Sequence, residues 1–341
     1  MDSRSVSESF HHLTCYHAAM NMPTISDIPE SSAPKQGGTI LAWLQLMRLP
    51  TVFTALSNIL CGFLITHRTP RLRVAELFDQ TELWMLLAST VGLYLGGMVL
   101  NDVFDSTVDA VERPERPIPS ERISKRAAAI FGTFLLLGGI GAAAAVGTPS
   151  LRIAAMIVPC VLAYNGFLKS TIAAPLGMGA CRFLNLMLGA SAVADVNSLW
   201  QTTPVTIAAA LGIYIVGVTV FARNEAGQSN PIMLIIGMVL VVCGISIDAW
   251  LIGNAGATLA SINGSRMALL ILSLNLLMRA AAAVPAPSPK RIQKTVGLML
   301  LCIIFLDAIM VFAMTADAKL AALVIMLVAP ASLLRRLIPM S

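Results

Sequence analysis

Residues 101–126 read NDVFDSTVDAVERPERPIPSERISKR and form the most charged run of an otherwise apolar chain. The run begins with an asparagine and three aspartates at spacings i, i+1, i+4 and i+8, namely Asn101, Asp102, Asp105 and Asp109. If the apolar segment before the run is a helix, these side chains share one side of its last turns. The carboxylates would repel one another and the negative end of the helix macrodipole. We therefore expect positive charge close to them.

Two sources of positive charge are available to these carboxylates. One is the set of arginines downstream, Arg113, Arg116 and Arg122. The other is a divalent cation, because carboxylate oxygens are hard ligands, and we predict Mg²⁺ bound by Asp102, Asp105 and Asp109. The alternative is an ordinary charged loop between membrane helices, whose acids and bases neutralise one another. Such a loop does not need acids at helical spacing.

The composition is that of a polytopic membrane protein. The chain has 341 residues, of which 57% are hydrophobic and 12% charged, and its mean hydropathy is +0.79, far outside the range of soluble domains. The net charge of +5 does not indicate a nucleic-acid partner, because the basic residues are scattered between apolar runs without interleaved aromatic residues. We expect an all-α bundle of nine or ten transmembrane helices around a central chamber. Apolar runs of roughly membrane-spanning length lie near residues 41–65, 83–104, 127–147, 151–168, 176–195, 204–223, 231–252, 263–284, 295–315 and 319–337.

The polar segments predict the domain limits and the orientation. Residues 1–37 are polar and lack the apolar core of a signal peptide, so we expect a disordered tail before a transmembrane domain over 38–341. Lys and Arg are concentrated in the segments that are cytoplasmic if the N-terminus is cytoplasmic. In that orientation the 101–126 run, Lys169 and the segment 221–230 emerge on one face and can form one site.

A diphosphate suits such a site. Mg²⁺ keeps coordination positions for waters and substrate phosphates. The remaining phosphate oxygens suit arginine forks and a lysine point charge, here from Arg113, Arg116, Arg122 and Lys169. Metal and basic residues together would stabilise a departing diphosphate, and an apolar chamber beside them would hold a hydrocarbon chain. An isoprenoid diphosphate has both parts.

The acidic motif and the loop after it resemble a known family. Asn101-Asp102-x-x-Asp105-x-x-x-Asp109, followed by RPIPSERI at residues 116–123, is similar to the first signature of the UbiA family of intramembrane prenyltransferases. Arg48, Pro50 and Asn58 look like the family's first helix, and Tyr164 with Lys169 resembles its element after the fourth span. The resemblance covers roughly residues 40–315. It implies a UbiA-like bundle that uses Mg²⁺ and a polyprenyl diphosphate donor, with catalytic roles for Asp102, Asp105, Asp109, Arg116 and Lys169.

The chain also departs from the family pattern. The second acidic motif is reduced to Arg223-Asn224-Glu225, so either Glu225 ligates a second Mg²⁺ alone or Arg223 replaces that metal as counter-charge of the diphosphate. The run GMGACRFLNLMLGAS at 177–191, with Arg182 and Asn185 on one helix face, looks more like the EboC-like bacterial branch. The substrate-binding residues that we predict are Asn58, Asn101, Arg113, Arg122, Tyr164, Arg182, Asn185, Arg223, Asn224 and Glu225.

These observations predict an integral membrane prenyltransferase, which we expect in a bacterial inner (cytoplasmic) membrane and in contact with membrane lipids. It would transfer a prenyl group from a polyprenyl diphosphate to an aromatic or other nucleophilic acceptor. A CDP-alcohol phosphotransferase is disfavoured, because its motif requires a glycine directly after the first aspartate, and here Val103 follows Asp102. The remaining alternative is a non-catalytic or transport-type protein on the same fold that binds or moves an isoprenoid or related lipid. Asp307, near the middle of a span, suits a helix–helix hydrogen bond as well as a role with substrate.

Overall fold

The computed structural model describes residues 38–67, 73–193, 199–200, 202–223, 231–254, 258–284 and 288–338. The described part is built from helices and contains no β-strand, as the composition predicts. The predicted tail over residues 1–37 lies outside the described residues. The helices, with η marking 3-10 turns, are α1 (Thr39–Leu46), η2 (Leu49–Thr51), α2 (Phe53–Thr66), α3 (Val74–Leu77), α4 (Thr81–Glu112), α5 (Lys125–Val146), α6 (Thr148–Gly166), η3 (Leu168–Ser170), α7 (Ala174–Gly189), α9 (Thr202–Ala222), α10 (Pro231–Asn254), α11 (Leu259–Ala281), α12 (Pro289–Thr315), α13 (Ala318–Ile325) and α14 (Val328–Leu337).

The chain is a multi-pass membrane protein. Within the described residues, 7 helices are long and apolar enough to cross a membrane, or up to 8 if the bent pair of α1 and α2 is one span. The predicted count of nine or ten goes slightly beyond this. The difference lies in α7, whose 16 residues fall short of the roughly 20 that a span needs, and in α6, which has 19 residues but includes Pro149, Arg152 and Pro159.

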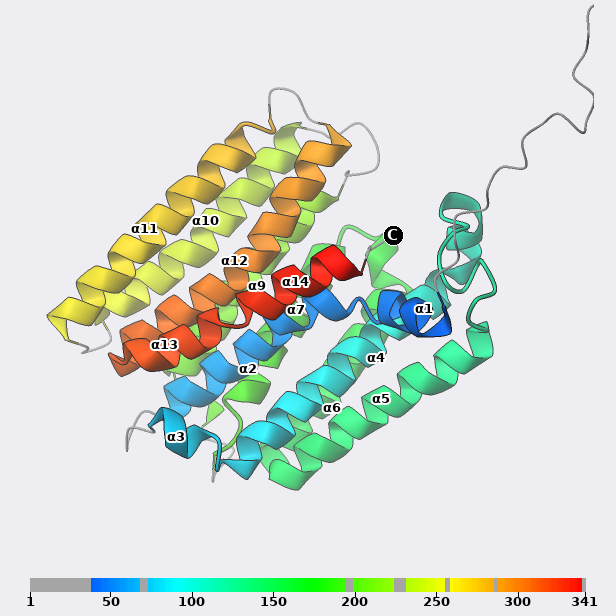
Figure 1. The fold of residues 1–341 in the computed structure, drawn as a ribbon. Helices are drawn as coiled ribbons and strands as arrows, with labels where there is room; N and C mark the ends of the chain where they lie inside the picture. Colours follow the sequence, from blue (N-terminus) through cyan, green and yellow to red (C-terminus); the bar gives the residue numbers. More distant parts are fainter. Residues whose placement is uncertain are drawn as a thin grey trace, which may run out of the picture. The chain divides into compact units, whose positions relative to one another are not determined.

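The helices of the membrane domain differ in how much lipid they face. Figure 1 shows α4, α5 and α6 on one side and α10, α11 and α12 on the other, with α2, α7 and α9 between them. The outer helices α5 and α11 expose large apolar side chains such as Phe134 (69% exposed) and Leu270 (63% exposed), which suits contact with hydrocarbon and not with water. The polar groups of the domain are therefore concentrated toward its interior.

Helix α2 lies at the centre of the domain, in contact with α4, α7 and α12. Most of its residues are buried, including the polar residues Ser57 and Asn58. Its approach to α7 depends on glycine. A Cβ atom on Gly62 would lie 2.3 Å from the carbonyl oxygen of Leu186, and one on Gly189 would lie 2.5 Å from that of Ile59. Small residues allow membrane helices to pack this closely, and the contact holds the polar residues of α2 against those of α7.

The break between α1 and α2 brings a cation to the end of α4. The two helices meet at 42°, and Arg48 at the break has φ of 47°, in the left-handed region that costs a non-glycine residue about 1 kcal/mol or more. Pro50 follows in η2 and prevents a continuous helix. Arg48 donates from Nη2 to Asp102 Oδ1 at 2.9 Å, so the bend is part of the site's construction.

The loop between α4 and α5 is packed, not loose. Its side chains Ile118 and Ile123 form a small buried cluster with residues of α1, α4 and α5. Arg122 holds the loop: its guanidinium donates to Glu115 O (2.9 Å), Ser120 Oγ (3.1 Å) and Gln45 Oε1 (3.2 Å). The loop therefore presents its remaining arginines in a fixed arrangement.

Candidate active site

The last turns of α4 form one wall of a cavity of about 420 Å³. Asn101, Asp105 and Asp109 line it at four-residue spacing, and Glu112 continues the same face. This confirms the predicted helical arrangement for three of the four residues. Asp102 is not among the lining residues. Asp102 directly follows Asn101, so it points to a different side of the helix, and it is buried with 5% of its surface exposed.

Each aspartate of the motif has a basic partner from a different part of the chain. Asp102 pairs with Arg48 at the α1–α2 break (2.9 Å), and Asp109 pairs with Arg116 in the α4–α5 loop (2.6 Å). The third pair joins Lys169 of η3 to Asp105. Arg116 Nη1 also lies 3.7 Å from Asp102 Oδ1, so this buried arginine bridges two acids. The positive charge expected from the sequence is therefore present, and it comes from three separate segments.

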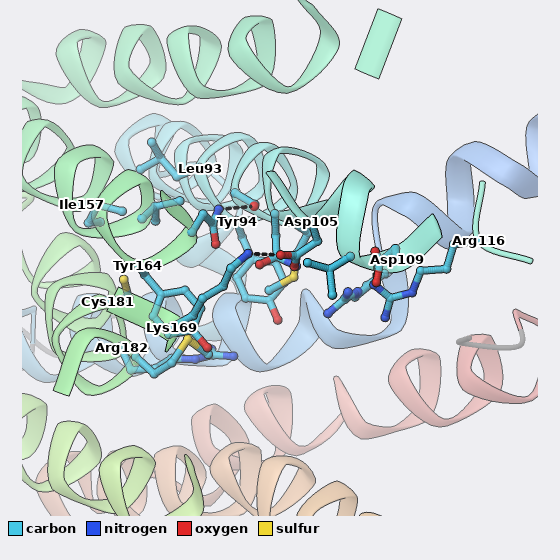
Figure 2. Close-up of a pocket in the computed structure, with 18 of the residues that line it drawn as sticks. Leu93, Tyr94, Asp105, Asp109, Arg116, Ile157, Tyr164, Lys169, Cys181 and Arg182 are labelled. Atoms are coloured by element: carbon cyan, nitrogen blue, oxygen red, sulfur yellow. Dashed lines mark hydrogen bonds and ion pairs between the residues drawn. The ribbon is translucent and has the colours of Figure 1, made fainter. Parts of the chain in front are cut away.

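The cavity has a charged end and an apolar end. The charged end carries the acids of α4 with Arg113, Arg116 and Lys169. Toward the start of α4 and along α6 and α7 the wall becomes mostly apolar, with Leu93, Gly97, Met98, Ile157, Val161 and Met178. Figure 2 shows Arg116 and Asp109 at one end of the drawn residues, and Ile157, Cys181 and Arg182 toward the other.

A few polar residues lie in the apolar part of the cavity. Tyr164 and Asn185, two of the residues predicted to bind substrate, line it. Asn185 Nδ2 donates to Ala55 O (2.9 Å), and its Oδ1 accepts from Thr90 Oγ1 (2.6 Å), so this amide mainly joins α2, α4 and α7. Arg182 also lines the cavity and lies over the Tyr94 ring, with Cζ 5.3 Å from its centroid.

Several predicted site residues are placed away from the cavity wall. Asn58 is buried behind Arg182 and accepts its Nη1 at 3.2 Å. Arg122 is occupied within the loop, as described above. Arg223, at the end of α9, is exposed and donates from Nη2 to Thr171 O (3.1 Å), which ties that helix end to the turn carrying Lys169. Asn224 and Glu225 lie outside the described residues.

The structure adds residues that were not in the predicted set. Arg48, Tyr94 and Glu112 all line the cavity. The signal for Glu112 was in the sequence, because it continues the helical face of Asp105 and Asp109. Arg48 was noted only as part of the first helix, and no pattern in the sequence shows that a kink would turn it toward Asp102.

Comparisons with known proteins show the family of this chain. Residues 55–338 match the model of the UbiA prenyltransferase family. Digeranylgeranylglyceryl phosphate synthase of Methanopyrus kandleri is 43% identical over 76 residues, which are 22% of this chain and 28% of that protein. The enzyme of the same name from Methanothrix thermoacetophila is 34% identical over 127 residues, 37% of this chain and 45% of that protein. These matches span less than half the length of the relatives.

Solved structures share the fold. A structure of a UbiA homologue from Archaeoglobus fulgidus bound to DMAPP and Mg²⁺ covers 80% of this chain and 99% of its own, with a TM-score of 0.58 and 15% sequence identity. At that identity the similarity shows the fold alone.

Proposed function

Because the chain belongs to the UbiA prenyltransferase family, we propose that it is an integral membrane prenyltransferase. It transfers a prenyl group from a polyprenyl diphosphate to an aromatic or other nucleophilic acceptor. One observation carries the proposal: acids and bases from α4, the α4–α5 loop and η3 meet at one end of a cavity whose other end is mostly apolar. A prenyl diphosphate has the same two-part chemistry.

The charged end suits Mg²⁺ together with a substrate diphosphate. Proteins hold Mg²⁺ by one or two carboxylates plus substrate phosphates. Asp105 and Asp109, with Glu112 and the amide oxygen of Asn101, offer such oxygen donors on the cavity wall. Within the described ranges no three His, Cys, Asp or Glu side chains form a metal site of their own, so the phosphates would complete the coordination. Asp102 would join only if its ion pair with Arg48 opened.

The reaction requires an exchange of partners among these charges. When bound, Mg²⁺ would neutralise charge on the departing diphosphate. If the acids held the metal, Arg116 and Lys169 would be free to donate to phosphate oxygens, and Arg113 already lines the cavity. Arg116 and Lys169, which balance Asp109 and Asp105 in the structure, would then balance phosphate oxygens, whereas Arg48 would stay with Asp102.

The C–O bond between the prenyl C1 and the diphosphate breaks, and the diphosphate leaves with the electron pair. A new bond forms between C1 and the acceptor nucleophile, which loses its proton to a carboxylate or water. The apolar wall of α4, α6 and α7 would hold the prenyl chain and limit the access of water to the allylic cation, since bulk water would compete with the acceptor.

The finer assignments belong to the same proposal. For the second motif, either Glu225 alone would ligate a second Mg²⁺ or Arg223 would replace that metal as counter-charge of the diphosphate. The hydrogen bond from Arg223 to Thr171 supports the second possibility, because Thr171 follows Lys169 by two residues. The cytoplasmic N-terminus rests on the distribution of Lys and Arg. The EboC-like branch and a bacterial inner membrane remain predictions, since the relatives compared above are archaeal synthases. Their name makes a glycerophosphate lipid a candidate acceptor class alongside aromatic compounds.

The test is a transfer assay. The protein in lipid nanodiscs is incubated with radiolabelled farnesyl or geranylgeranyl diphosphate and a panel of acceptors, with and without EDTA. We expect a labelled lipid product that EDTA abolishes and that Asp105→Asn reduces at least 100-fold, with insertion unchanged. If no product forms across the whole panel, and the protein reconstituted in vesicles moves the label between them, the transport-type alternative is established instead.

A further inference from the structure

The last third of the chain gathers basic residues at one end of its helices and keeps its acids elsewhere. Residues 259–341 contain two acids, Asp307 and Asp317. Asp317 caps the start of α13, beyond the far end of α12. Asp307 lies eighteen residues after the start of α12, which is roughly 27 Å along the helix. The basic patch is formed by the end of α11, the start of α12 and the end of α14, with Arg279, Lys290, Arg291, Lys294, Arg335 and Arg336.

These cations have no carboxylate partner among the described residues. The ion pairs found there involve other bases, and Arg279 donates from Nε to a neutral acceptor, Asn275 Oδ1, at 3.0 Å. All six residues of the basic patch are exposed. Like charges gathered at one place repel one another, so an anion from outside the chain would stabilise them.

One cation of the basic patch lies in a notch on α12. A Cβ atom on Gly297 would be 2.7 Å from Nη2 of Arg335 and 2.9 Å from its Nη1, so the guanidinium lies directly against the glycine. Lys290 and Lys294 precede Gly297 by seven and three residues and therefore share one side of α12 with it. The absence of a side chain at Gly297 lets a cation of α14 join two cations of α12.

Apolar surface adjoins the charges. Leu333 and Leu337 share the side of α14 that carries Arg336, and they are 58% and 63% exposed. Met278, beside Arg279, is 57% exposed. Cations next to exposed apolar side chains suit the level of the lipid headgroups, where the cations meet phosphates and the apolar side chains meet acyl chains. A free phosphate ion in water would use the cations alone.

The basic patch lies at the end of the bundle that holds the acids of α4. Helix α14 contacts η2 and α2, and η2 begins directly after Arg48, the partner of Asp102. A ligand that holds the end of α14 against α12 would therefore also support the helix break that positions Arg48.

We propose that the basic patch is a binding site for the phosphodiester headgroup of an anionic membrane lipid, with Lys294 and Arg335 at its centre. The lipid phosphate supplies the negative charge that the described part of the chain does not, and the acyl chains cover Leu333 and Leu337. Clusters of Lys and Arg beside membrane helices bind anionic lipids in this way. The site is distinct from the prenyl diphosphate cavity, whose wall includes none of these six cations.

The alternative is that these residues only orient the chain during insertion, because Lys and Arg are enriched at the cytoplasmic ends of membrane helices in general. That role depends on the number of charges and not on their arrangement in the folded protein. Gly297→Ala separates the two possibilities. It keeps every charge and displaces only the Arg335 guanidinium, which is the flexible end of a side chain.

The experiment measures lipid binding to the full chain purified in a neutral detergent. The protein is titrated with phosphatidylglycerol, with phosphatidylcholine of the same acyl chains, and with inorganic phosphate, and bound lipid is counted by native mass spectrometry while thermal unfolding is followed in parallel. We expect phosphatidylglycerol alone to be retained and to raise the unfolding temperature. Equal retention of the two lipids would overturn the proposal. An equal rise with inorganic phosphate would make the basic patch a phosphate site and would also overturn it.

Variants locate the site. Arg335→Gln and Gly297→Ala should each weaken phosphatidylglycerol binding about 5-fold, the worth of one Lys or Arg near an anionic lipid surface. Lys294→Gln combined with Arg335→Gln should weaken it about 25-fold. The matched control is Lys125→Gln with Arg126→Gln, which removes two exposed cations from the start of α5 and should leave the affinity unchanged.

Two outcomes with the variants would refute the site. Equal losses in the two double variants would reduce the effect to net charge. A wild-type affinity in Gly297→Ala would show that binding does not depend on where the Arg335 guanidinium lies. Prenyl transfer is not part of this test, so the lipid site and the proposed function can fail independently.

Discussion

Replacing Arg116 by glutamine tests the charge balance of the site most directly. Arg116 is 5% exposed and lies 2.6 Å from Asp109 Oδ2 and 3.7 Å from Asp102 Oδ1. At an effective dielectric near 20, these two attractions are roughly 6 and 4 kcal/mol, although desolvation of the three groups offsets most of that sum. The variant leaves two buried carboxylates with reduced compensation.

We expect Arg116→Gln to destabilise the protein by about 3 to 5 kcal/mol, the usual cost of breaking a buried ion pair. At roughly 2 °C per kcal/mol this lowers the apparent unfolding temperature by about 6 to 10 °C. The assay is thermal unfolding of the purified protein in one detergent at a fixed scan rate. Membrane proteins often unfold irreversibly, so apparent unfolding temperatures can be compared only when they are measured under identical conditions.

Arg122→Gln provides the matched control in the same loop. Its guanidinium makes neutral hydrogen bonds to Glu115 O, Ser120 Oγ and Gln45 Oε1, so we expect a smaller loss of stability. The double variant Arg116→Gln with Asp109→Asn should recover part of the loss, since both charges of the closest pair are then gone. Equal unfolding temperatures for wild type, Arg116→Gln and Arg122→Gln would refute the role of Arg116 as the buried counter-charge.

Three further predictions follow from the same geometry. Lys169→Met should reduce prenyl transfer at least 100-fold, because Asp105 loses its partner and the diphosphate loses a cation; product formation close to wild type in the labelled transfer assay would contradict this. Gly62→Ala should destabilise the protein, since the new Cβ would lie 2.3 Å from a backbone oxygen of α7. Gly141→Ala, whose Cβ would have nothing within 4 Å, should be neutral or slightly stabilising. Equal unfolding temperatures for the two variants would rule out the close contact. Arg48→Ala leaves Asp102 with the more distant Arg116 alone and should lower the unfolding temperature, and an unchanged value would show that this pair is not closed in solution.

The sequence determined the local features of this protein. The membrane class follows from apolar runs, because a bilayer requires backbone hydrogen bonds to be satisfied within each helix. The spacing of the motif predicted one helix face, and Asn101, Asp105 and Asp109 confirm it by lining the cavity together, whereas Asp102 does not line it. The convergence of this face with Lys169 followed from counting spans, since successive helix ends alternate between the two membrane surfaces.

The tertiary structure decided which groups meet. Arg48 and Asp102 are separated by 54 residues, and Lys169 and Asp105 by 64; their pairing depends on a helix break and on a turn whose geometry no periodicity reveals. Asp307 contacts Asn58 across 249 positions, so this contact could not be read from spacing. The predicted span count goes slightly beyond what the described helices support, because hydropathy measures how apolar a run is and not how many residues its helix contains, which is 16 for α7. The sequence thus determined which segments are membrane helices and which side chains share a helix face, because both depend on residues close together along the chain. Helix packing decided which cation reaches which anion and where the cavity lies, because those contacts depend on close approach between segments distant in sequence.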